Sequence, residues 1–101
     1  MSNRDMYIQK AKAKFDNLGA ELKRLEAEGE EMTADAEIKR REHMKLLRRQ
    51  MATVEDRIEK LHAASEEAWN DVKNGFETAW NDLSETFRQA QARYASDSAN
   101  S

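Results

Sequence analysis

Residues 64–90 read ASEEAWNDVKNGFETAWNDLSETFRQA, and two features of this stretch determine how the chain is expected to fold. The 11-residue pattern W-N-D-[VL]-x-x-x-F-x-x-A begins at Trp69 and starts again at Trp80. Eleven residues fill three helical turns at about 3.67 residues per turn, so the repeated apolar side chains stay on one face of a helix. Just before the repeat, Ser65 and two glutamates supply a capping hydroxyl and the acidic first turn of a new helix.

The repeat predicts a second helix over about residues 66–94, after a break near residues 62–66. A Trp and Phe stripe at helical spacing is more often packed in a core than offered to a ligand. The small, polar residues 95–101 are expected to form a disordered tail. The interaction and packing stripe of this helix comprises Trp69, Val72, Phe76, Trp80, Leu83, Phe87 and Tyr94.

Upstream of the repeat, a heptad pattern of apolar residues predicts one long helix over about residues 5–64. The apolar positions are alternately three and four residues apart, as in a coiled-coil seam. An extra four-residue step through Arg40 is expected as a stutter inside a continuous helix. The heptad seam comprises Phe15, Leu18, Leu22, Leu25, Met32, Met44, Leu47, Met51, Val54, Ile58 and Leu61.

A long helix of this kind cannot bury its own seam. It would be about 90 Å long at about 1.5 Å per residue. If the chain reverses near Ser65, Trp69 meets Leu61 and the other aromatic residues of the stripe meet aliphatic residues of the seam. We therefore predict an all-α, elongated coiled coil in which the second helix folds back antiparallel as a helical hairpin, all within a single domain over residues 1–94.

The distribution of charge supports the same hairpin. Residues 39–60 carry eight basic and four acidic side chains, whereas residues 61–88 carry two basic and six acidic ones. The hairpin would place Glu85 beside Arg48, and opposite charges then favour this orientation. Residues 5–36 would project with an uncovered heptad face, so a homo-oligomer is expected, with the chain itself as the partner.

Composition excludes several classes of function. The 101 residues include no Pro and no Cys, which excludes a disulfide framework, a thiolate metal site and cysteine catalysis. Mean hydropathy is −1.02, and no apolar run is long enough to cross a membrane. Residues 1–5 lack the apolar stretch of a secretory signal, so a cytoplasmic protein is expected.

The candidate chemistry is sparse. His43 and His62 are the two histidines, and 19 residues of one helix would separate them by about 28 Å, too far to share a metal. There is no Gly-rich phosphate loop, nucleophile elbow or metal-ligand spacing. The sequence therefore predicts a non-enzymatic protein with no catalytic residue, cofactor or metal.

Two binding alternatives remain open. Helices with 11-residue repeats and aromatic faces can lie on lipid or hydrophobic granules, although the acidic polar face of this stripe disfavours an anionic membrane. Nucleic-acid binding is less favoured, because the one basic stretch has no interleaved aromatic residue for base stacking. That basic patch comprises Arg41, Lys45 and Arg48.

The chain resembles a family of small bacterial coiled-coil proteins, some labelled stress-response proteins, found in cyanobacteria and proteobacteria. The resemblance is carried by residues 64–83, with two Trp eleven apart, a Gly between them and an acidic polar face. It implies a helical, non-catalytic protein connected with stress, and it brings no catalytic or binding residue with it. The likeness extends to the N-terminal half through Tyr7, Lys14, Asp16, Ala20-Glu21-Leu22 and Ala34-Asp35-Ala36-Glu37-Ile38.

Overall fold

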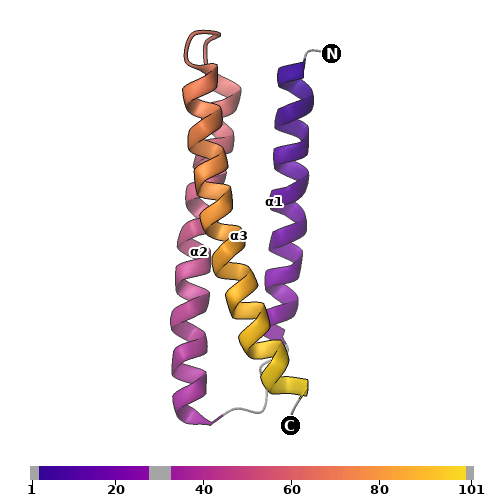
Figure 1. Cartoon of the computed structure of the whole chain (residues 1–101), viewed down its shortest axis with the longest axis vertical. Helices are drawn as coiled ribbons and strands as arrows, with labels where there is room; N and C mark the ends of the chain where they lie inside the picture. The colour runs from indigo at the N-terminus through magenta and orange to yellow at the C-terminus, as the bar shows by residue number, and fades with distance from the viewer. Residues whose placement is uncertain (1–2, 28–32, 100–101) are drawn as a thin grey trace.

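The described part of the chain is a bundle of three helices. The computed structural model describes the backbone of residues 3–27 and 33–99, and side chains up to residue 92. The helices are α1 (Asn3–Ala27), α2 (Ala34–Ala63) and α3 (Trp69–Ala99). α1 and α3 run in one direction and α2 runs in the other (Figure 1). The predicted all-α fold class is confirmed.

α2 and α3 form the predicted antiparallel hairpin and share the most extensive packing in the bundle (Figure 1). α2 ends at Ala63, and Ala64 has extended backbone with φ −68° and ψ 137°. The Ser65 hydroxyl accepts a hydrogen bond from the backbone N–H of Ala68 at 3.2 Å, which caps a short turn. The chain therefore reverses where expected, although α3 itself begins at Trp69 rather than near residue 66.

The C-terminal end of α3 differs from the expectation. Helix continues to Ala99, whereas residues 95–101 were expected to be a disordered tail. This segment contains no Pro or Gly to interrupt a helix that has already formed. Residues 100–101 lie outside the described residues.

The predicted single helix over residues 5–64 is wrong, because two antiparallel helices occupy this range. α1 ends at Ala27, and the Thr33 side chain caps α2 by accepting a hydrogen bond from the N–H of Ala36 at 3.3 Å. Acidic residues in the first turn of α2 further stabilise this helix start. Folding back buries the seam within one chain, whereas one continuous helix would leave much of it in water.

The core lies where the apolar faces of the three helices meet. Four side chains at its centre, Leu47, Val54 and Leu61 of α2 and Leu83 of α3, are completely buried. The bundle measures 51 × 21 × 15 Å, so it is elongated but much shorter than the rod expected from a continuous helix. The remaining buried apolar residues are Ile8, Ala11, Leu18, Leu22, Leu25, Met44, Ile58, Phe76, Phe87 and Ala90.

Arg40 connects the start of α2 to the end of α1. Its side chain is buried and donates hydrogen bonds to the backbone carbonyl oxygens of Leu25, at 3.4 Å, and Glu26. Carbonyl groups in the last turn of a helix have no partner within the helix, and a cation there is favoured by the helix dipole. The expectation that Arg40 marks a stutter within a continuous helix is therefore wrong. Its side chain instead caps the C-terminal end of α1.

Arg4 has the matching position at the other end of the same helix pair. It donates hydrogen bonds to the carbonyl oxygens of Leu61, at 3.2 Å, and Ala64. Its guanidinium also lies 4.7 Å from the ring centroid of Trp69, at the start of α3. Arg4 thus holds the N-terminal end of α1 against the α2–α3 turn.

Candidate functional site

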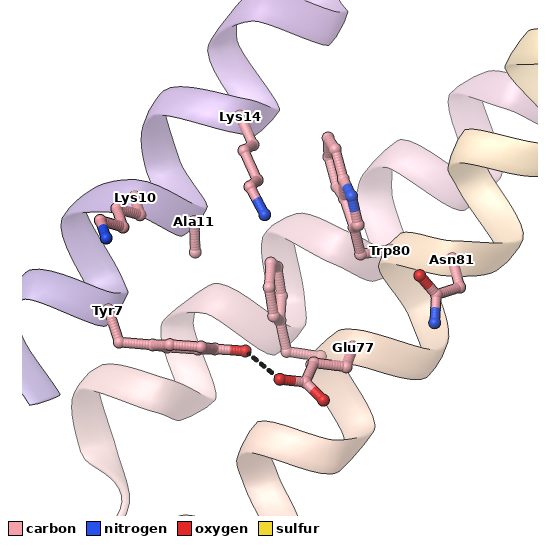
Figure 2. Close-up of a pocket in the computed structure, with 8 residues that line it drawn as sticks. Tyr7, Lys10, Ala11, Lys14, Glu77, Trp80 and Asn81 are labelled. Carbon is pink, nitrogen blue, oxygen red and sulfur yellow. Dashed lines mark hydrogen bonds between the residues drawn. The ribbon is translucent and has the colours of Figure 1, made fainter.

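Tyr7 connects α1 to α3. Its hydroxyl donates a hydrogen bond to Glu77 Oε1 at 2.9 Å, the dashed line in Figure 2. Its ring meets the rings of Trp69 and Phe76 edge-on, with centroid separations of 5.7 and 6.0 Å. Edge-to-face aromatic contacts stabilise a structure beyond the area that they bury, so Tyr7 positions α1 against the aromatic stripe of α3.

A cavity of about 300 Å³, which we call the α1–α3 groove, opens beside this contact. Phe76 and Trp80 form an apolar wall, with ring centroids 6.4 Å apart and ring planes inclined by 22°. Ala11 is buried, and its small side chain leaves room that a larger residue would fill. Figure 2 shows the Lys14 amine extending from α1 into the cavity, with Trp80 beside it. The groove is lined by Tyr7, Lys10, Ala11 and Lys14 of α1 and by Phe76, Glu77, Trp80 and Asn81 of α3.

Basic groups outnumber acidic ones around the groove. Lys10 and Lys14 line it, and Lys73 Nζ lies 5.1 Å from the centroid of the Tyr7 ring. Among the described lining residues the acidic group is Glu77, whose carboxylate accepts the Tyr7 hydrogen bond. Burial raises the pKa of the Tyr7 hydroxyl, and the hydrogen bond and negative charge of Glu77 raise this pKa further. Tyr7 therefore stays protonated and keeps donating to Glu77 at neutral pH.

A second hollow, of about 550 Å³, lies between α1 and α2. Phe15, Gly19 and Met51 contribute to its lining, and a Cβ added to Gly19 would lie 3.4 Å from Met51 Cε. Two charged residues of its lining, Arg48 and Glu26, form an ion pair at 2.6 Å. With Asp16 and Lys23 the lining holds two acidic and two basic residues, so this hollow has no excess charge to select a charged ligand, unlike the α1–α3 groove.

The predicted packing stripe of the second helix lies mainly inside the bundle. Its half-buried members pack against the core, so the stripe faces the other two helices. At the edge of the stripe, Trp80 also lines the α1–α3 groove. Phe76, Leu83 and Phe87 are buried, Trp69, Val72 and Trp80 are half-buried, and the side chain of Tyr94 lies outside the described residues.

The predicted heptad seam is divided between α1 and α2, and its two halves lie against each other and against α3. Met32 lies outside the described residues. The seam residues Leu18, Leu22, Leu25, Met44, Leu47, Val54, Ile58 and Leu61 are buried, and Phe15 and Met51 are half-buried.

The predicted basic patch lies on α2, and carboxylates contact two of its three members. Arg41 pairs with Glu37 at 3.4 Å, and Arg48 pairs with Glu26 of α1 at 2.6 Å. Lys45 is exposed. These ion pairs reduce the positive charge that the patch presents to an anionic polymer.

The charges of the hairpin are matched differently from the expectation. Arg48, expected beside the acidic face of the second helix, contacts α1 instead. Glu85 of α3 pairs with Arg88 in its own helix. The antiparallel hairpin is therefore held mainly by its apolar seam, which agrees with the small contribution of exposed ion pairs.

The histidines lie on one helix, as predicted, with His43 in the first third of α2 and His62 in its last turn. Within residues 3–27 and 33–99, no three His, Cys, Asp or Glu side chains gather in a way that could hold a metal ion. His62 lines a shallow hollow near the N-terminal part of α1.

Several residues of the site were missed from the sequence. Tyr7 precedes Ala11 by four residues, so it continues the seam toward the N-terminus, and this spacing was the available signal. Lys10 has no signal of its own, because it joins the groove only when α3 lies beside α1. The groove depends on tertiary packing and cannot be read from periodicity within one helix.

The chain matches no family model, and comparisons with curated proteins and with solved structures find no match. None of the helices in the described part of the chain is long and apolar enough to cross a membrane.

Proposed function

We propose that the chain is a non-catalytic structural and interaction protein, and that the α1–α3 groove is its binding surface. One observation carries the proposal: the groove combines a half-buried Trp80 with Lys10 and Lys14 around open space. Binding sites for small molecules typically pair apolar walls with a few polar groups in this way. The α2–α3 seam, by contrast, is closed by packing at Leu47 and Leu83.

The two tryptophans allow a direct test. Trp80 lines the groove, whereas Trp69 packs against Tyr7 outside it, so their indole N–H signals in a ¹H–¹⁵N NMR spectrum report on different places. We expect a panel of small ligands of different charge to contain compounds that shift the Trp80 signal more than the Trp69 signal. Trp80→Phe would assign the signals. A panel that leaves Trp80 unchanged, or a compound that is chemically converted, would contradict the proposal.

Self-association is a second part of the proposed function, and exposed apolar residues on α2 favour it. Ile38 is 56% exposed and Leu46 is 38% exposed, eight positions apart on this helix. The uncovered seam expected on residues 5–36 no longer supplies the reason, because the described seam residues of α1 pack within the chain. Light scattering should give a mass above that of one chain, and Ile38→Glu should lower it. A single-chain mass at every concentration would refute self-association.

The lipid or granule alternative is less well supported. Phe76 and Phe87 of the stripe are buried in the bundle, and exposing each such side chain costs about 1.5–3 kcal/mol. Surface binding through this stripe would require α3 to separate from the other helices. Added vesicles would then have to change both tryptophan environments, whereas binding in the groove changes mainly that of Trp80.

A stress-related role is proposed from the family resemblance alone. It adds no residue to the site and is compatible with a small helical scaffold. Measuring whether the amount of the protein in its cells rises under heat, salt or oxidative stress tests it. A constant amount under all three conditions would contradict it.

A further inference from the structure

We infer that the α1–α3 groove binds a small anion with a flat apolar body, such as an aromatic carboxylate. This inference rests on the proposed function of the groove as a binding surface and specifies its ligand class. Two independent features of the groove support it, the shape of its apolar wall and the sign of its charge.

The apolar wall suits a flat ring system. Trp80 is half-buried and supplies the accessible ring of this wall, the buried ring of Phe76 is nearly parallel to it at 22°, and the small side chain of Ala11 leaves room on α1. Stacked arrangements of this kind stabilise aromatic groups beyond their buried area. The cavity volume of about 300 Å³ is at the lower end of the range for small-molecule sites, so one or two fused rings fit better than a larger ligand.

The charge of the groove selects an anion. Lys14 extends its amine into the cavity beside Trp80, so a carboxylate on a ring lying against Trp80 can meet this ammonium group (Figure 2). Lys10 lines the same cavity, and Lys73 adds a cation near Tyr7. The opposing carboxylate, Glu77, already accepts the Tyr7 hydrogen bond. Charge-assisted contacts with lysine favour a carboxylate ligand over a neutral one.

This local charge is opposite to that of the whole chain. The sequence has 17 Lys and Arg against 20 Asp and Glu, a net charge of −3. An acidic protein has no general attraction for small anions, so preferential binding at Trp80 would arise from the groove itself. Binding to the groove is thereby distinguishable from weak, delocalised ion binding.

The test compares two ligands of nearly equal shape, 2-naphthoate and its neutral counterpart 2-naphthalenemethanol. Each is titrated into the ¹⁵N-labelled full chain while the Trp80 and Trp69 indole N–H signals are followed. We expect 2-naphthoate to shift Trp80 in a saturable manner and to bind at least about threefold more tightly than the alcohol, the size expected for partly exposed charge pairs. Trp69 should move less than Trp80 in both titrations.

Lysine variants test which ammonium groups contribute to binding of the ligand carboxylate. Lys14→Gln and Lys10→Gln should each weaken 2-naphthoate binding by about twofold to fivefold and weaken binding of the alcohol by a smaller factor, because the alcohol carries no charge for the ammonium group to pair with. Lys12→Gln is the matched control, because Lys12 is exposed on the same helix and does not line the groove. Circular dichroism of each variant verifies that the helices remain folded.

The outcomes separate the two proposals. If both ligands shift Trp80 with equal affinity, the inference about the anion is wrong and the groove remains a binding surface. If neither these ligands nor the wider panel shifts Trp80, both proposals are wrong. An equal loss of affinity in Lys12→Gln and Lys14→Gln would also overturn the assigned role of Lys14.

Discussion

Arg4 and Arg40 lie at opposite ends of the antiparallel α1–α2 pair, and each donates hydrogen bonds to carbonyl oxygens at the end of the other's helix. Arg4 of α1 reaches Leu61 of α2, and Arg40 of α2 reaches Leu25 of α1. Both guanidinium groups therefore satisfy backbone carbonyls that a helix end leaves without partners. Because contacts at both ends must form together, this pair of arginines fixes how far α1 and α2 overlap.

Replacing Arg40 by Met should lower the free energy of unfolding by about 2 kcal/mol, because charge-assisted hydrogen bonds to buried carbonyls are lost. Met keeps much of the apolar volume of the side chain, so the change reports mainly on the hydrogen bonds. Arg41→Met is the matched control. The Arg41 side chain is 73% exposed and pairs with Glu37 in its own helix, so we expect its replacement to lower the free energy of unfolding by less than about 0.5 kcal/mol. Urea denaturation followed by circular dichroism measures both, and equal losses would contradict the capping role.

Thr33→Ala distinguishes the two-helix arrangement from one continuous helix by the sign of its effect. In the structure Thr33 caps α2, so Ala should destabilise the chain by about 1 kcal/mol. Inside a continuous helix the same change would stabilise it by up to about 0.7 kcal/mol, because Ala has the higher helix propensity. Thr33→Ser keeps a capping hydroxyl and should be close to neutral. A rise in melting temperature for Thr33→Ala would contradict the helix boundary.

The difference between the predicted and the observed number of helices shows what periodicity can establish. The 11-residue repeat and the signal at Ser65 predicted the α2–α3 hairpin, because both depend on local sequence. The same kind of signal, a capping hydroxyl followed by acidic residues, is present at Thr33, but the apolar spacings of three and four residues continue on both sides of it and predict a continuous helix. When the apolar spacing of a seam continues across a turn, the spacing does not indicate what buries the seam. Another helix of the same chain and a second copy of the chain can both cover it.

The site was less accessible from sequence than the fold. Arg40 was visible as a charged residue in an apolar seam, but the carbonyls that it meets are exposed only once α1 ends. Tyr7 and Glu77 are 70 positions apart and meet only when α3 returns to the N-terminal part of α1. Pairings of this kind follow from the tertiary arrangement, which helix periodicity alone does not specify.

Tyr7→Phe should change how stability depends on pH. In the folded chain burial and Glu77 raise the pKa of Tyr7 above its ordinary value of 10.0. The stabilising contribution is therefore complete below about pH 10 and decreases above it, because the unfolded chain releases this proton while the folded chain keeps it.

The measurement compares urea denaturation of Tyr7→Phe and the unchanged chain at neutral pH and at several values above pH 10. At neutral pH the free energy of unfolding of the variant should be lower by about 0.5 kcal/mol, the contribution of an exposed hydrogen bond. Above pH 10 the difference between the two proteins should shrink, because the variant has no hydroxyl proton at position 7 to release on unfolding. If the difference in free energy of unfolding between the two proteins grows with pH, the raised pKa assigned to Tyr7 is wrong.

Leu47→Ala and Leu46→Ala test whether the apolar seam is closed within a single chain. Leu47 is completely buried, so its truncation should lower the free energy of unfolding by about 2–5 kcal/mol. Its neighbour Leu46 is 38% exposed, and its truncation should lower the free energy of unfolding by less than about 1 kcal/mol. If the seam closes within the chain, the urea midpoint of Leu47→Ala falls by the same amount at low and high protein concentration. A seam buried between copies would instead make both the midpoint and the cost of the substitution depend on concentration, because unfolding would then include dissociation. A concentration-dependent midpoint with an unchanged cost at Leu47 is the effect expected of the proposed self-association through the outer face of α2, whereas a concentration-dependent cost at Leu47 would reassign the seam contacts of α1 to another copy.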